Sequence, residues 1–160
     1  MEHIAQCTAK VYESVGLLQP SDQELVLAAL QATGTAYAPY SHFRVGAAVR
    51  LASGEIVCGS NQENAAYPSG LCAERVALFS AFAQFPKDEL QSIAIAATRQ
   101  AQNGVFVQTP EPITPCGACR QVLCEYASRA SQPVRLLMAG IKEIWLVEDA
   151  RLLLPFAFIL

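Results

Sequence analysis

Three cysteines and one glutamate are the residues of this chain whose types and spacing could do chemistry. Cys72 and Glu74 stand two positions apart in the run Cys-Ala-Glu. Cys116 and Cys119 form a Cys-x-x-Cys pair further along the chain. Three thiolates are one ligand short of a closed tetrahedral zinc site, so a fourth position would be left for water. A carboxylate beside that water could move protons to and from it, and the pattern therefore predicts a hydrolytic zinc site.

Two other interpretations of the cysteines stay open at this stage. A Cys-x-x-Cys pair is also typical of closed structural zinc sites and of redox pairs. A closed site would need a fourth ligand, and the sequence offers Cys58, Cys124, His3 and His42. The glutamate favours catalysis, because a structural zinc site has no need of a carboxylate at that position.

Two helices are predicted to begin at the cysteines, one over residues 72–85 before a proline and one over 116–129. The N-terminal end of a helix carries partial positive charge and free amides, so it lowers the pKa of a thiol and stabilises a thiolate. An earlier helix is predicted over 22–33, where Ser21 and Glu24 fit a capping box.

Five strands are predicted, at residues 44–49, 55–60, 92–98, 134–138 and 143–147. The third is apolar on both faces and should be central, and the last two should be antiparallel because their link is too short for a parallel crossover. The pattern predicts an α/β fold of three α/β/α layers, with a mixed five-stranded sheet and helices on both faces. We expect this domain over residues 21–160, after an N-terminal extension over 1–20 that is loosely held or forms a short helix.

Composition excludes several classes of partner. The 160 residues carry a net charge of −3 without a basic run, which argues against nucleic acid. No apolar run reaches the roughly 18 residues of a membrane span, and the start lacks a signal peptide, so we expect a cytoplasmic protein without a membrane partner. Charged residues make up only 16%, and residues 152–160 are almost wholly apolar. We expect that end to be buried on the protein or on a neighbouring subunit.

Four motifs, in the same order, resemble the small homotetrameric cytidine deaminases. They are Tyr40-Ser-His-Phe43 with Val45-Gly-Ala-Ala48, Asn61-Gln-Glu-Asn-Ala-Ala-Tyr67, Cys72-Ala-Glu-Arg75 and Pro115-Cys-Gly-Ala-Cys-Arg-Gln121. The resemblance implies the cytidine deaminase-like fold and hydrolytic deamination of cytidine and 2′-deoxycytidine to uridine and 2′-deoxyuridine, with release of ammonia, in pyrimidine salvage. It also implies one Zn²⁺ per subunit and a homotetramer with shared active sites.

The same resemblance implies a role for individual residues. Cys72, Cys116 and Cys119 would be the zinc ligands, Glu74 would protonate N3 of the pyrimidine while C4 is attacked, and Arg75 would hydrogen-bond the thiolates. The implied substrate contacts are Phe43 on the base, Asn61 and Glu63 on the ribose hydroxyls, Ala65 and Tyr67 in the pocket wall, the amide of Ala73 on the base, and Phe158 from a neighbouring subunit, with Phe156 as its rival.

Plainer roles and other functions remain as alternatives. Phe43 could belong to the core and Asn61 to a turn. An amide and a carboxylate suit sugar hydroxyls better than a phosphate, which favours a nucleoside over a nucleotide. The alternative functions are a deaminase of another cytosine-containing small molecule and a non-catalytic, zinc-stabilised binding protein.

Overall fold

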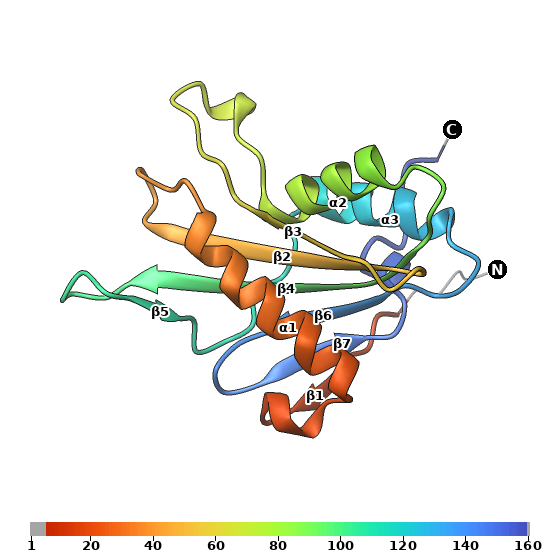
Figure 1. The fold of residues 1–160 in the computed structure, drawn as a ribbon, viewed down its shortest axis with the longest axis horizontal. Helices are drawn as coiled ribbons and strands as arrows, with labels where there is room; N and C mark the ends of the chain where they lie inside the picture. Colours follow the sequence, from red (N-terminus) through yellow and green to blue (C-terminus); the bar gives the residue numbers. More distant parts are fainter. Residues whose placement is uncertain (1–5, 160) are drawn as a thin grey trace.

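A mixed β-sheet with helices on both faces forms the body of the protein (Figure 1). The computed structural model describes residues 6–159. Within them the strands are β1 (Lys10–Tyr12), β2 (Phe43–Leu51), β3 (Ile56–Ser60), β4 (Leu90–Gln100), β5 (Phe106–Gln108), β6 (Arg135–Ala139) and β7 (Ile144–Val147). The helices are α1 (Pro20–Ala32), α2 (Ala73–Gln84) and α3 (Gly117–Ser128). The predicted three-layer α/β/α fold is confirmed.

Strand β4 lies in the middle of the sheet, as predicted. The order is β1-β7-β6-β4-β2-β3, and β5 pairs with β4 outside that path. β4 runs parallel to β6, which is reached through α3, whereas β4 and β2, β2 and β3, and β6 and β7 are antiparallel. The expected antiparallel pairing of the last two strands is therefore confirmed.

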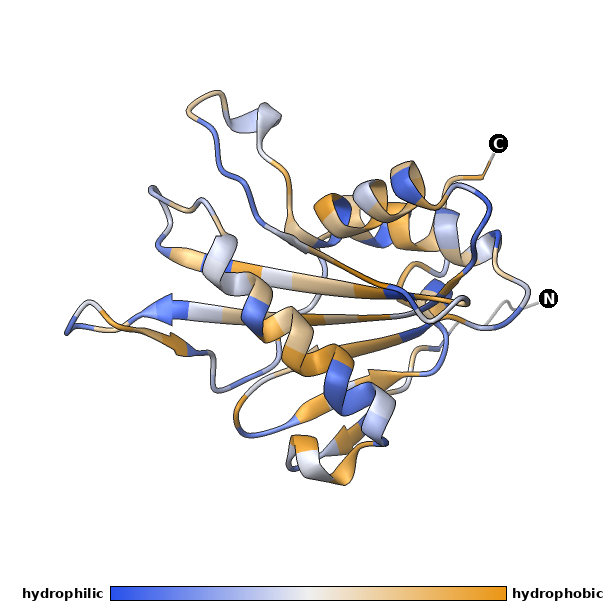
Figure 2. Ribbon diagram, in the orientation of Figure 1, coloured by the Kyte–Doolittle hydropathy of each residue, from blue (hydrophilic) through white to orange (hydrophobic). Residues whose placement is uncertain are grey.

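The alternation of side chains along β4 builds two separate hydrophobic cores, because successive residues of a strand point to opposite faces. Ile93 and Ile95 pack in one core with α2 and α3. Ala94 and Ala96 pack in the other core with α1. Hydrophobic residues accordingly fill the middle of the strands, while the far end of β4 turns hydrophilic (Figure 2).

Two glycines allow a helix to lie directly on a strand. A Cβ atom added at Gly46 of β2 would stand 2.1 Å from the carbonyl oxygen of Ala29 in α1. On the opposite face, a Cβ atom at Gly59 of β3 would stand 2.4 Å from the backbone nitrogen of Ala77 in α2. Neither position has room for a side chain unless the helix moves away from the sheet.

The prediction of five strands is wrong, because the sheet has seven strands within residues 6–159. β1 lies in the segment expected to be loose or helical, where the only helical turn before α1 in the described residues is the 3₁₀ turn Val15–Leu17. β5 lies between the predicted strand 92–98 and the predicted helix 116–129, in a stretch where no strand was predicted. Both strands are three residues long and are antiparallel additions to longer partners, β7 and β4.

The predicted capping box at the start of α1 is also wrong. Gln19 is the N-cap and Pro20 occupies the first turn, so Ser21 lies inside the helix. Proline suits this position because its fixed φ is helical and its missing N–H would have no partner there. In residues 6–159 no helix is long and apolar enough to cross a membrane.

Candidate active site and metal centre

The cysteines of the predicted site meet where two helices begin. Cys72 is the N-cap of α2, Cys116 is the N-cap of α3, and Cys119 lies in the first turn of α3. The Sγ atoms of Cys72 and Cys116 are 3.9 Å apart. All three sulfur atoms lie within 4.8 Å of one another. Residues far apart in the sequence therefore form one cluster, as predicted.

The cluster fits a zinc ion with an open coordination position. Tetrahedral sulfur ligands at about 2.3 Å from zinc stand about 3.8 Å from one another, close to the observed separation of Cys72 and Cys116. Within residues 6–159, no further histidine, cysteine or acid joins the group, so Cys58, Cys124 and His42 do not close it. His3 lies outside the described residues. Cys116 is exposed and Cys119 is buried, so the group can be reached from one side.

The thiols of Cys72 and Cys119 change each other's pKa. A hydrogen bond from Cys119, helped by Arg75, lowers the pKa of Cys72 to about 5. The same contact with Cys72, together with burial, raises the pKa of Cys119. The contact between Cys72 and Cys119 thus stabilises a thiolate within the cluster, and the thiolate is the form of cysteine that binds a cation.

Glu74 is the buried carboxyl of the site, with only 4% of its surface exposed. It lies in the first turn of α2, two residues after Cys72. Burial raises its pKa above the ordinary value, and the negative charge on Cys72 acts in the same direction. A carboxyl whose pKa is moved towards neutrality can both accept and donate a proton, which suits it to acid–base chemistry.

Arg75 follows Glu74 and points back to the cluster. Its Nη2 donates to the Sγ atom of Cys72 over 3.9 Å, a long contact even for sulfur. Its Nε is buried and has no hydrogen-bond partner within the described part of the chain. The guanidinium offsets the negative charge that three thiolates would bring to one cation.

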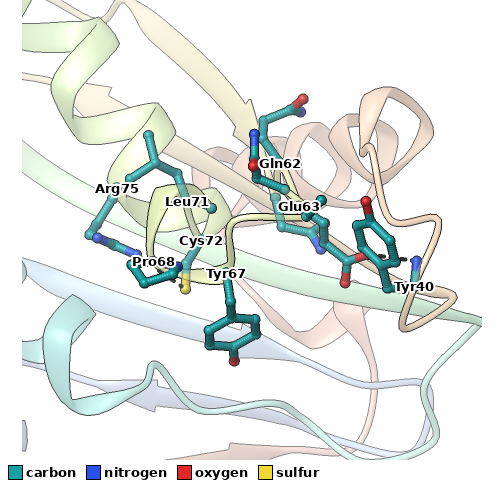
Figure 3. Close-up of a pocket in the computed structure, with 12 residues that line it drawn as sticks. Tyr40, Gln62, Glu63, Tyr67, Pro68, Leu71, Cys72 and Arg75 are labelled. Carbon is teal, nitrogen blue, oxygen red and sulfur yellow. Dashed lines mark hydrogen bonds between the residues drawn. The ribbon is translucent and has the colours of Figure 1, made fainter.

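A cavity of about 550 Å³ opens beside the cluster. Its walls are Tyr40, Asn61, Gln62, Glu63, Asn64, Ala65, Tyr67, Pro68, Gly70, Leu71, Cys72 and Arg75. Cys72 and Arg75 lie at one end of this group and Tyr40 and Glu63 at the other (Figure 3). A cavity of this size accommodates a small organic molecule.

Backbone pairing closes the base of the loop that forms most of this cavity. Gln62 and Leu71 exchange two N–H···O bonds, each of 2.9 Å. The carboxylate of Glu63 accepts from the amides of Tyr40, at 2.9 Å, and Ser41, at 3.3 Å. A hydrogen bond from the Ser41 side chain is the main reason why the pKa of Glu63 is lowered. Glu63 is thus a fixed anion at the end of the cavity away from the cysteines.

Asn61 joins the cavity to strand β2. Its Oδ1 accepts from the amide of Val45 over 2.8 Å, and its Nδ2 donates to the carbonyl of Phe43 over 3.0 Å. One amide hydrogen and one oxygen lone pair remain for a ligand. Asn61 therefore has a structural role and keeps the capacity to bind.

Three of the predicted substrate contacts do not line the cavity of this single chain. Phe43 is half-buried on β2, with the guanidinium carbon of Arg99 5.2 Å from its ring centroid. Ala73 is fully buried in the first turn of α2. Phe158 is 68% exposed, and its backbone is held on α3 by the side chain of Gln121 at 2.8 and 3.1 Å.

Six residues of the cavity wall were not predicted. They are Tyr40, Gln62, Asn64, Pro68, Gly70 and Leu71. Five of them stand inside or directly beside the motifs that carry the predicted contacts, and Gly70 stands two residues before Cys72. A prediction that the whole loop from Asn61 to Leu71 forms the wall would have found all of them except Tyr40.

The fold and the cluster together define a class of protein, an α/β domain with a three-cysteine cluster and a buried carboxyl beside it. The family model described as the cytidine and deoxycytidylate deaminase zinc-binding region matches residues 19–132. The chain belongs to this deaminase family. Its site is accordingly a zinc centre, and Cys72, Cys116 and Cys119 are the residues that can hold the ion.

Relatives of known name support this assignment. A cytidine deaminase of Halalkalibacterium halodurans is 43% identical over 138 residues, which cover 85% of this chain and 92% of that protein. The crystal structure of cytidine deaminase from Burkholderia pseudomallei has a TM-score of 0.68 at 38% identity, covering 84% of this chain and 97% of the other. Blasticidin-S deaminase of Bacillus cereus is 31% identical over 110 residues, covering 69% of this chain and 76% of that protein.

Proposed function

We propose that this protein hydrolyses cytidine and 2′-deoxycytidine to the corresponding uridines and ammonia, with a catalytic domain over residues 21–160. The observation that carries the proposal is the buried carboxyl of Glu74 beside three thiols that leave a coordination position open. Burying a carboxyl has a cost in free energy, and a purely structural zinc site gains nothing from it. The non-catalytic binding protein is therefore disfavoured.

Glu74 would carry the protons of the reaction. Zinc, when bound, lowers the pKa of a coordinated water and so supplies the nucleophile. The carboxylate would take a proton from that water and deliver it to N3 of the pyrimidine as oxygen adds to C4. The proton of the hydroxyl group now on C4 would pass through Glu74 to the amino group, the bond between C4 and that nitrogen would break, and ammonia would leave as C4 becomes a carbonyl. The raised pKa of Glu74 suits both transfers.

The remaining residues would orient the nucleoside. Asn61 and Glu63 would bind the ribose hydroxyls, and the fixed negative charge of Glu63 would disfavour a phosphorylated sugar. Ala65 and Tyr67 would complete the wall of the cavity that they line. Phe43 and the amide of Ala73 would contact the base.

Another cytosine-containing small molecule is the second candidate substrate. The similarity to a protein named blasticidin-S deaminase favours it. The cytidine deaminase of Halalkalibacterium halodurans is more similar, at 43% identity over 85% of this chain, which favours the nucleosides.

We also propose a homotetramer in which Phe158 of one subunit closes the cavity of another, with Phe156 as the alternative. Phe158, Ile159 and Tyr67 are 68%, 78% and 91% exposed, which supports burial against a second copy. Sedimentation of the zinc-loaded protein tests this assembly. A monomer with full turnover would refute it.

An absorbance assay with cytidine and 2′-deoxycytidine tests the function on zinc-loaded protein. We expect Glu74→Gln to retain zinc and to lose turnover by at least about 10²-fold, the usual contribution of a positioned proton carrier. Glu125→Gln, on the exposed side of α3, is the matched control and should behave as wild type. Equal activity of wild type and Glu74→Gln would refute the role of this carboxyl. A wild type that turns over neither nucleoside, but does turn over blasticidin S, would favour the second candidate.

A further inference from the structure

Arg99 lies near the end of β4, on the face of the sheet that carries the active site. It is the register partner of Phe43 on β2, in a series that continues with Val45 opposite Ala97. Because side chains alternate along a strand, Phe43 and Arg99 share the face of Ala47, which packs with α2 and α3. The arginine is thus on the side of the metal centre.

The Arg99 side chain is placed between two neighbours. The carbon of its guanidinium group stands 5.2 Å from the centroid of the Phe43 ring, within the range of a cation–π contact. Val107 of β5 is its register partner on the other side. Residues directly opposite one another in antiparallel strands have neighbouring side chains, so Val107 borders the Arg99 side chain on the side away from Phe43.

The β4–β5 hairpin that holds Arg99 is closed by its own hydrogen bonds. The amide of Ala101 donates to the carbonyl of Val105 over 2.8 Å. The side chain of Gln100 donates to the carbonyl of Gly104 over 3.1 Å. Arg99 therefore projects from a braced strand end and not from a loose loop.

Phe43 connects Arg99 with the cavity. Its backbone carbonyl accepts a hydrogen bond from the side-chain amide of Asn61, which lines the cavity. The side-chain oxygen of Asn61 in turn accepts from the backbone amide of Val45. Phe43 is therefore one hydrogen bond away from the wall of the cavity.

We propose that Arg99 is a positioning residue for the nucleoside, which holds the Phe43 ring in the orientation that receives the base. The proposal rests on the proposed function, in which Phe43 contacts the base. Arg99 touches no reacting atom, so it acts on the binding of substrate and leaves the chemical step unchanged. Its loss should raise KM and leave kcat as it is.

Arg44 provides a matched control within the same strand pair. It is next to Phe43 in the chain but on the opposite face, where its guanidinium carbon stands 3.6 Å from the ring centroid of Phe106. The two arginines make the same kind of contact at the same end of the sheet. Only Arg99 lies on the face of the active site.

Steady-state kinetics of zinc-loaded Arg99→Gln, Arg99→Lys and Arg44→Gln test the proposal. For Arg99→Gln we expect KM for cytidine to rise about two- to fivefold, the equivalent of one exposed cation–π contact, at unchanged kcat. Arg99→Lys keeps a cation over the ring and should recover most of the loss. Arg44→Gln should keep the wild-type KM. In a Phe43→Leu background, Arg99→Gln should have no further effect on KM.

Four results would overturn the proposal. They are an unchanged KM in Arg99→Gln, an equal rise in Arg44→Gln, a fall in kcat with constant KM, and a further rise in KM when Arg99→Gln is added to Phe43→Leu. If Arg99→Gln does not fold, the comparison of Arg99→Lys with Arg44→Gln decides, because the proposal requires near-wild-type KM in both. Failure of the proposed function has a different signature, since the wild type itself would then turn over neither nucleoside.

Discussion

Gly59→Ala should disturb the metal centre, because Gly59 lies directly against α2, the helix that carries Cys72 and Glu74. The new Cβ atom would lie 2.4 Å from the backbone nitrogen of Ala77, where ordinary contacts are 3.4–4 Å. The helix must therefore move by about 1 Å, because the atom it meets is backbone and packed interiors have no spare volume.

The displaced helix carries Cys72 at its start and Glu74 in its first turn. Overpacking of this kind destabilises by about 1–3 kcal/mol, and each kcal/mol lowers the melting temperature by roughly 2–4 °C for a chain of this size. A misplacement of about 1 Å can lower turnover by about 10²-fold. Gly59→Ala should therefore lose stability, zinc affinity and kcat together.

Gly46→Ala is the contrasting variant. Its Cβ atom would lie 2.1 Å from the carbonyl oxygen of Ala29, so it displaces α1, on the face away from the metal centre. We expect a similar loss of stability with little change in zinc affinity or kcat. Gly34→Ala meets nothing within 4 Å and should be neutral. Thermal melting, zinc titration and the nucleoside assay compare the three variants. Wild-type zinc affinity and kcat in Gly59→Ala, or equal losses in Gly46→Ala, would refute this account.

Two charged contacts away from the site give further predictions. Asp149→Asn should lower the free energy of unfolding by about 1 kcal/mol at pH 7. The hydrogen bond from Arg151 lowers the pKa of Asp149 in the folded protein. The stabilisation is therefore complete above the ordinary pKa of an aspartate and is lost as the pH falls through the lowered pKa. Melts of both proteins between pH 7 and pH 2.5 check this, and a difference that is independent of pH would contradict it. Asp22→Asn should cost about 2 kcal/mol in urea unfolding at unchanged kcat, because the buried carboxylate accepts bonds of 2.9 and 2.7 Å from Arg135 on the α1 side of the sheet. An unchanged unfolding midpoint would show that the pair contributes nothing.

Most of the fold could be predicted because its central elements have long and strongly biased sequences. Ser92 to Thr98 is apolar on both faces, and that pattern alone placed β4 in the middle. β1 and β5 could not be found in this way. Lys10–Tyr12 and Phe106–Gln108 are too short to show a periodic pattern, and they are strands only because β7 and β4 offer open hydrogen-bonding edges. The N-cap of α1 was missed because Pro20 competes with the capping signal at Ser21.

The metal centre was predictable from residue types, whereas the shape of the cavity was not. Cys72 and Cys116 stand at predicted helix N-termini, so the helix boundaries fix where their side chains lie. The wall of the cavity depends on a loop whose ends are held together by the backbone pairing of Gln62 and Leu71. No local sequence pattern predicts this pairing. The position of Arg99 likewise depends on the register between β4 and β2, which only the assembled sheet defines.

Strand β1 has a consequence for the behaviour of the protein in solution. β1 pairs with β7 and so covers the hydrogen-bonding edge of that strand. Ile144 and Leu146 of β7 are only 1% and 4% exposed. The new edge is short and carries Lys10, and both properties make it a poor template for another chain. Proteolytic removal of the first dozen residues would uncover a longer apolar edge at β7. Protein that lacks these residues should therefore aggregate before it loses its catalytic activity. The molecules that remain in solution should keep an intact active site.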